Sequence, residues 1–76
     1  MVQAYIMITS AIGEVRTVYS NLEERDNVKS TNIVTGPFDI IALVEADDLS
    51  TLTNAVVENI RDIEGVIDTN TAIVVE

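Results

Sequence analysis

The sequence has 76 residues, a formal net charge of −9, and neither cysteine nor histidine. This composition excludes disulfide bridges and the usual structural zinc sites, and the length leaves room for one domain, which we expect over residues 1–76. The surplus of 13 acidic over 4 basic side chains repels phosphate groups, so direct binding of nucleic acid or of an anionic membrane is not expected.

The first half of the chain predicts a strand, a helix and a second strand. Residues 2–9 (VQAYIMIT) are rich in strand-forming side chains, and residues 28–35 (VKSTNIVT) predict a half-exposed strand. Apolar residues recur at helical spacing over residues 12–22, beginning with Ile12. Ser10 is a suitable N-cap residue for that helix.

The second half repeats this order. Residues 40–46 (IIALVEA) predict a buried strand, and the acidic residues Asp47 and Asp48 suit the start of the next helix. An apolar stripe indicates that this helix runs from Leu49 to Ile63. Gly65 is expected as the C′ residue that ends it, and residues 66–75 (VIDTNTAIVV) as the last strand.

The predicted order βαββαβ is that of the ferredoxin-like motif, an α+β fold. Right-handed crossovers place strands one and three at the centre of an antiparallel sheet with the order 4-1-3-2. Both helices then cover the same face of the sheet, and Tyr5 and Met7 point to the other face.

The uncovered face predicts a dimer. A small core is often supplemented by oligomerisation, and monomers seldom expose a large apolar patch. We therefore expect two subunits to stack sheet to sheet as a dimeric α+β barrel, with Tyr5 and Met7 in the interface. In the alternative, these two side chains simply border the core.

Nothing in the sequence favours catalysis, a cofactor or a metal. Histidine and cysteine, the common bases and nucleophiles, are absent, and the glycines are isolated rather than grouped in a phosphate-binding loop. The acidic pairs at residues 23–24 and 47–48 are adjacent, and adjacent residues on a helix do not face each other. We expect a protein that is not an enzyme.

One group of side chains suits a small zwitterion such as an amino acid. Gly36 permits close approach of the backbone, Phe38 offers an apolar wall, and Asp39 can meet an ammonium group. Thr69 and Thr71 point the same way on the last strand, and their hydroxyls can bond a carboxylate. An ordinary turn beside an ordinary edge strand would have the same residues, and that alternative stays open.

Two stretches of the sequence resemble a known family. Residues 34–44 (VTGPFDIIALV) resemble the VTG-x-[YF]-D-hydrophobic signature of the Lrp/AsnC ligand-binding domain. Residues 65–75 (GVIDTNTAIVV) resemble that family's GV-x-x-T-x-T-x-hydrophobic ending, and residues 47–52 fit its helix opening less specifically. The resemblance extends over residues 2–76, and the two motifs are specific in combination.

The resemblance implies a ferredoxin-like dimer that assembles into a ring, for example an octamer or decamer, with amino-acid effectors bound between dimers. Gly36, Phe38 and Asp39 would meet the ligand from one subunit, and Thr69 and Thr71 from strand four, from a neighbouring dimer in one arrangement. Pro37 replaces the polar residue common there and removes one N–H group.

The family's transcription factors carry an N-terminal helix-turn-helix domain, for which 76 residues leave no room. The chain is therefore expected to be a stand-alone cytoplasmic module of this family that acts on transcription or amino-acid metabolism through partner proteins, including a full-length regulator. Two alternatives are a purely structural assembly subunit and a small ferredoxin-like enzyme. The sequence does not identify the amino acid, because selectivity depends on pocket shape.

Overall fold

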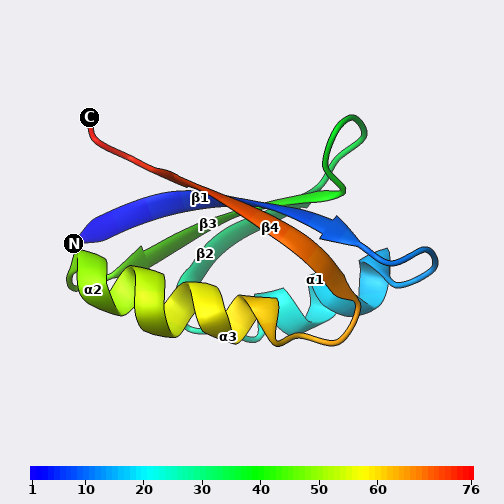
Figure 1. Cartoon of the computed structure of the whole chain (residues 1–76), viewed down its shortest axis with the longest axis horizontal. Coiled ribbons are helices and arrows are strands. Elements are labelled where there is room, and N and C mark those ends of the chain that lie inside the picture. The colour runs from blue at the N-terminus through cyan, green and yellow to red at the C-terminus, as the bar shows by residue number, and fades with distance from the viewer.

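The computed structural model describes residues 1–76 and consists of one antiparallel sheet with helices on one face (Figure 1). The elements follow the predicted order, but the second helical stretch, residues 49–61, contains a central π-helical turn. Their bounds are β1 Val2–Ser10, α1 Val15–Glu23, β2 Val28–Ile33, β3 Ile40–Ala46, α2 Leu49–Thr51, η1 Leu52–Val56, α3 Val57–Arg61 and β4 Val66–Ile73.

The sheet has the order β2-β3-β1-β4, which confirms the predicted order 4-1-3-2 and the ferredoxin-like α+β fold. The central strand β1 is antiparallel to both neighbours: Ile6 lies opposite Ala42 of β3 and Thr71 of β4. Because paired residues share a face, this register fixes which side chains each face presents.

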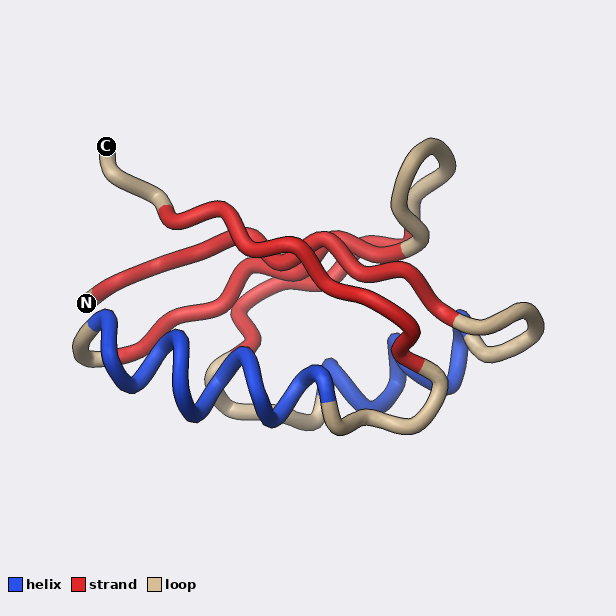
Figure 2. The backbone as a smooth tube through the Cα atoms, in the orientation of Figure 1, coloured by secondary structure: helices blue, strands red, loops and turns tan.

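The two faces differ in burial. The face toward the helices carries the core, which includes Ala4, Ile6 and Ile8 of β1 and their partners on β3. All helical segments lie on this side of the sheet (Figure 2). On the other face, which we call the open face, Tyr5 is 46% exposed and lies opposite Leu43. The predicted division of β1 into a buried and an open face is confirmed.

The start of the first helix was predicted wrongly. Ser10 ends β1 instead of capping a helix, and α1 begins only at Val15. Between them, Gly13 has φ 84°, a left-handed conformation that interrupts a right-handed helix. Ile12 therefore lies fully exposed in this turn and contributes nothing to the core.

The second helical stretch begins as predicted, since the Asp48 carboxylate caps it by accepting a hydrogen bond from the Thr51 N–H at 2.7 Å. The π-turn that follows was not predicted. Its wider bond joins the Val57 N–H to the Leu52 carbonyl. Within the turn the Thr53 hydroxyl donates to the Leu49 carbonyl at 3.0 Å, competing with the backbone for that acceptor.

The end of this stretch also differs from the prediction. α3 ends at Arg61 with Asp62 as its C-cap, so Gly65 is not the C′ residue. Gly65 instead has φ 100° in the turn before β4, where its carbonyl accepts a hydrogen bond from the Ala11 N–H at 2.8 Å. A Cβ atom at position 65 would lie 3.0 Å from the Val18 side chain, so the turn packs tightly on α1.

The outer strands are shorter than predicted. β2 ends at Ile33 because the Val34 N–H bonds across the base of the next loop, to the Asp39 carbonyl at 2.9 Å. β4 ends at Ile73 instead of residue 75.

The helical segments are too short and too polar for any of them to span a lipid bilayer.

Candidate functional site

The predicted turn between β2 and β3 is a loop of residues 34–39 with a closed base. The Asp39 N–H donates to the Ile8 carbonyl at 2.9 Å, and the Asp39 carbonyl accepts from Val34 at the same distance. The loop projects to the side of the sheet away from the helices (Figure 1). Its apex contains Gly36, which has a φ of 140°, and Phe38, which is half-buried.

Three N–H groups between the two ends of this loop make no hydrogen bond within the chain. Those of Thr35, Gly36 and Phe38 donate no hydrogen bond to any backbone or side-chain acceptor of the chain. Pro37 between them has no N–H group. An exposed loop with free N–H groups is a chemically suitable receptor for a carboxylate.

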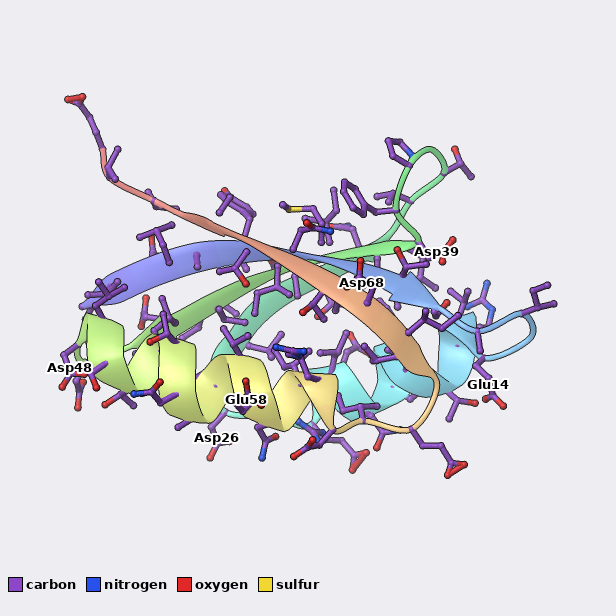
Figure 3. The ribbon with its side chains drawn as sticks, in the orientation of Figure 1. Glu14, Asp26, Asp39, Asp48, Glu58 and Asp68 are labelled. Carbon is purple, nitrogen blue, oxygen red and sulfur yellow. The ribbon has the colours of Figure 1, made fainter.

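The carboxylate of Asp39 is held at the end of the sheet (Figure 3). Its Oδ2 atom accepts hydrogen bonds from the Ser10 N–H at 2.9 Å and from the Ser10 hydroxyl at 3.4 Å. Its Oδ1 atom accepts none from the chain. Asp39 therefore has one oxygen that positions the loop and one that is available to a ligand.

Thr69 and Thr71 do point the same way, but not toward the loop. They lie opposite Ile8 and Ile6, so their side chains are on the helix-covered face, at the sheet edge. Strand β1 lies between β4, which carries the threonines, and β3, which follows the loop. The backbones of β4 and β3 are therefore two strand spacings, or about 10 Å, apart. Within one chain, the structure groups the three loop residues and leaves the threonines apart.

Two pockets are present, and none of the five predicted ligand-binding residues lines either one. The smaller, of about 100 Å³, lies along the start of β2. The larger, of about 260 Å³, lies on the helix side between the turn after α1 and the second helical stretch. Its lining residues are Arg25, Asp26, Asn27, Val28, Thr51, Ala55, Val56, Asn59 and Ile60.

The larger pocket is the feature that the sequence did not reveal. The polar run at residues 23–27 has the composition of a fraying helix end, yet Arg25 there donates from Nε to the Asn59 side chain at 2.7 Å. The two residues are 34 positions apart, so no local pattern connects them. The only hint of this pocket in the sequence is Arg25 itself, a single basic residue within the acidic run at residues 23–27.

Two groups have shifted pKa values, both outside the 34–39 loop. The hydrogen bond from the Thr51 N–H lowers the pKa of Asp48 below its usual value of 3.8. The hydrogen bond to the Glu23 side chain, one helical turn away, raises the pKa of Tyr19 above 10.0. No group of three or more acidic side chains is placed to hold a metal ion.

Comparison with known proteins identifies close relatives of this fold. The model of the Lrp/AsnC ligand binding domain family matches residues 3–76. The crystal structure of FFRP-DM1 is 35% identical with a TM-score of 0.93, over 99% of this chain and 100% of that one. That of TTHA0845 from Thermus thermophilus is 30% identical with a TM-score of 0.91, over 100% of this chain and 95% of that one.

A third structure is more distant in sequence. The transcriptional regulator NMB0573 from Neisseria meningitidis, solved as a complex with L-Met, is 19% identical with a TM-score of 0.86. The match covers 99% of this chain and 50% of the regulator, so this chain spans half of its length. The comparison with curated proteins finds no match.

Proposed function

Because this chain belongs to the Lrp/AsnC ligand-binding domain family, we propose that it binds a free α-amino acid and transmits the signal to partner proteins. Membership makes it a regulatory ligand-binding module rather than an enzyme. The amino-acid ligand is supported by the regulator of similar fold that was solved with L-Met. In this proposal residues 1–76 act as one domain for ligand binding and oligomerisation.

The observation that carries the proposal is the chemistry of the 34–39 loop. Free N–H groups at Gly36 and Phe38 can donate to a carboxylate, and the free Oδ1 of Asp39 can accept from an ammonium group. The Phe38 ring offers an apolar wall. The loop alone thus complements both charges of a zwitterion.

The loop is half of the proposed site. Thr69 and Thr71 lie on the edge strand and on the other face, so they cannot join the loop of the same chain. We place them in the site from a neighbouring subunit, whose β4 edge would face the loop. Binding would then depend on assembly, which suits an effector that reports through quaternary structure.

The assembly itself is proposed to begin at the open face. Tyr5, Met7, Ile41 and Leu43 form its apolar centre, and polar residues of the outer strands surround them. A second copy stacked sheet to sheet would cover this patch. The 34–39 loop rises on the same side and would flank the partner (Figure 1). Such dimers are proposed to form a ring, an octamer or decamer.

The partner in regulation is proposed to be a DNA-binding protein, for example a full-length regulator of the same family, working in the cytoplasm. The chain's net charge of −9 disfavours direct contact with DNA. The effect would therefore reach transcription or amino-acid metabolism through shared assembly. A purely structural role, without a ligand, is the competing function.

Calorimetry with a panel of amino acids tests the proposal. We expect one or more to bind the wild type, and Asp39→Ala to bind about 10- to 150-fold more weakly, the effect of losing a charge-assisted bond. Ser10→Ala is the matched control, because it disturbs the same loop anchor but keeps the carboxylate. Light scattering must show the same assembly state for all three proteins.

Two outcomes would contradict the proposal. If no amino acid binds the wild type, the chain is a structural subunit. If the wild type and Asp39→Ala bind equally, Asp39 only holds the loop and the ammonium group is bound elsewhere.

A further inference from the structure

The pocket of about 260 Å³ on the helix side is distinct from the proposed amino-acid site. It lies in one chain, between residues 25–28 and residues 51–60. In Figure 3 Asp26 marks this side of the molecule, whereas Asp39 lies at the end of the sheet. Its apolar lining comes from Val28, Ala55 and Ile60, with Val56 beside them. The volume suits a small molecule rather than a water molecule alone.

Arg25 is the single cation that lines this pocket. Its guanidinium is fixed by two hydrogen bonds, from Nε to the Asn59 side chain and from Nη1 to the Asn21 carbonyl, both at 2.7 Å. A guanidinium has five N–H donors, so three remain for a ligand. The ion pairs of the chain join Lys29 to Glu45 and Arg61 to Glu58, so Arg25 has no carboxylate partner within 4.0 Å.

Two arginines of the chain, Arg16 and Arg25, have no carboxylate partner within 4.0 Å, and of these two only Arg25 lines the pocket. The guanidinium of Arg25 is held in place by neutral acceptors, in a pocket whose nine lining residues include four hydrophobic ones. Fixed geometry and free donors are the properties of a preorganised anion site.

The opposite wall of the pocket contains the π-turn. Thr51, Ala55 and Val56 line the pocket and lie in or next to the turn η1. π-turns within helices occur frequently at functional sites, because they displace a segment of the helix that a regular turn would keep in register. Here the displaced segment forms the wall that faces Arg25 and Asn27 across the pocket.

We propose that this pocket binds a small aliphatic monocarboxylate. Its carboxylate would bond the free donors of Arg25, and its hydrocarbon chain would lie on Val28 and Ala55. A monoanion is favoured over a dianion, since the pocket offers one cation and has the acidic residue Asp26 among its lining residues. The ligand class includes deaminated acids and amino acids, which share this carboxylate and differ in the ammonium group.

Nuclear magnetic resonance titration with 4-methylpentanoate tests the site, with 4-methylpentanamide as the uncharged probe. We expect the acid, and not the amide, to shift the amide signals of residues 25–28 and 51–60. Leucine differs from this acid only by an α-ammonium group, so it tests whether the pocket prefers amino acids or deaminated acids. Equal or tighter binding of leucine in this pocket assigns it to amino acids, and weaker binding assigns it to deaminated acids.

Three variants locate the binding. Arg25→Gln should weaken binding of 4-methylpentanoate about tenfold or more, the effect of losing a charge-assisted bond. Arg16→Gln removes the same charge from an exposed position of α1 that does not line the pocket, and it should leave binding unchanged. Ala55→Leu should abolish binding by filling the pocket, and it keeps the hydrogen bonds of Arg25 intact.

The proposal is overturned if the acid causes no shifts in the wild type, or if Arg25→Gln and Ala55→Leu both bind as the wild type does. Leucine shifts confined to residues 34–39 and 69–71 would support the amino-acid site alone, while the result with 4-methylpentanoate still decides the pocket. The two sites thus succeed or fail independently.

Discussion

The carboxylate of Asp39 accepts a hydrogen bond from the Ser10 N–H at 2.9 Å, which joins the last residue of the 34–39 loop to the last residue of β1. Because Ser10 is 7% exposed, its N–H has little access to water and depends on this acceptor. The same side chain that is proposed to meet a ligand therefore also holds the loop. Stability measurements separate these two roles.

Asp39→Ala should lower the free energy of unfolding by about 1–3 kcal/mol, because it leaves the buried Ser10 N–H without an acceptor. Ser10→Ala removes only the hydroxyl contact at 3.4 Å and should change stability less. Asp39→Asn keeps an oxygen acceptor, so its loss of unfolding free energy should lie between those of Asp39→Ala and Ser10→Ala. Urea unfolding measures all three, and an equal loss in Asp39→Ala and Ser10→Ala would show that the N–H bond is unimportant.

Tyr5→Glu should dissociate the assembly, since it places a charge in the proposed sheet-to-sheet interface, where desolvation is costly. Leu49→Glu is the control: it makes the same kind of change at a side chain that is 50% exposed on the helix side. Light scattering at micromolar concentration should show at least a dimer for the wild type and the control. A monomeric wild type would contradict the interface.

Gly65→Ala should destabilise the fold more than Gly13→Ala. Both residues have positive φ, so each substitution costs about 1–2 kcal/mol of backbone strain. At position 65 the new Cβ also meets Glu14 and Val18 at 3.0 Å, and overpacking adds about 1–3 kcal/mol. At position 13 it meets no atom within 4 Å. Urea unfolding of both variants measures the two losses of stability. Similar losses in Gly65→Ala and Gly13→Ala would refute the prediction.

The cap at Asp48 predicts a dependence of stability on pH. Its pKa is lower in the folded chain than the usual 3.8, so the ionised carboxylate stabilises the fold above that value. The contribution is lost as the pH falls through the folded pKa. Asp48→Asn keeps the cap but cannot ionise, so the wild type should melt higher at neutral pH and lose this advantage below pH 3.8.

Thermal melting monitored by circular dichroism across this range measures the difference between the two proteins. Asp48→Ala, which removes the cap, should melt about 4–8 °C lower than the wild type at neutral pH. A constant difference between the wild type and Asp48→Asn from neutral to acid pH would show that the charge contributes nothing.

The 76 residues alone should not retard duplex DNA at physiological salt, because a net charge of −9 repels the phosphate backbone. An electrophoretic shift assay over several salt concentrations is the measurement. Salt-sensitive binding below micromolar concentration would contradict the proposal that a partner supplies the contact with DNA.

Strong periodic patterns made most of the fold predictable. The apolar run at Ile40–Ala46 gave the bounds of β3 correctly, and alternation along β1 identified Tyr5 and Met7 on the open face. The errors lie where a single contact with a residue distant in the sequence determines the local structure. Ser10 is a good cap by type, but its hydroxyl and N–H bond Asp39, 29 positions later, and this places it in the sheet.

The binding features were less predictable for a physical reason. The 34–39 loop is contiguous in sequence, so its residue types alone indicated a turn with an available aspartate. The helix-side pocket joins Arg25 to Asn59 through the tertiary fold, and the π-turn keeps the same apolar spacing as a regular helix. Neither leaves a local pattern.

The strand order also bears on whether the chain can be divided. The first half contributes β1 and β2 and the second half β3 and β4, yet the order β2-β3-β1-β4 alternates strands from the two halves. No two strands of one half are neighbours, so a fragment cut within the 34–39 loop has no strand partner of its own. Each fragment would therefore need the other to form any part of the sheet, so the two halves of the chain are expected to fold only together.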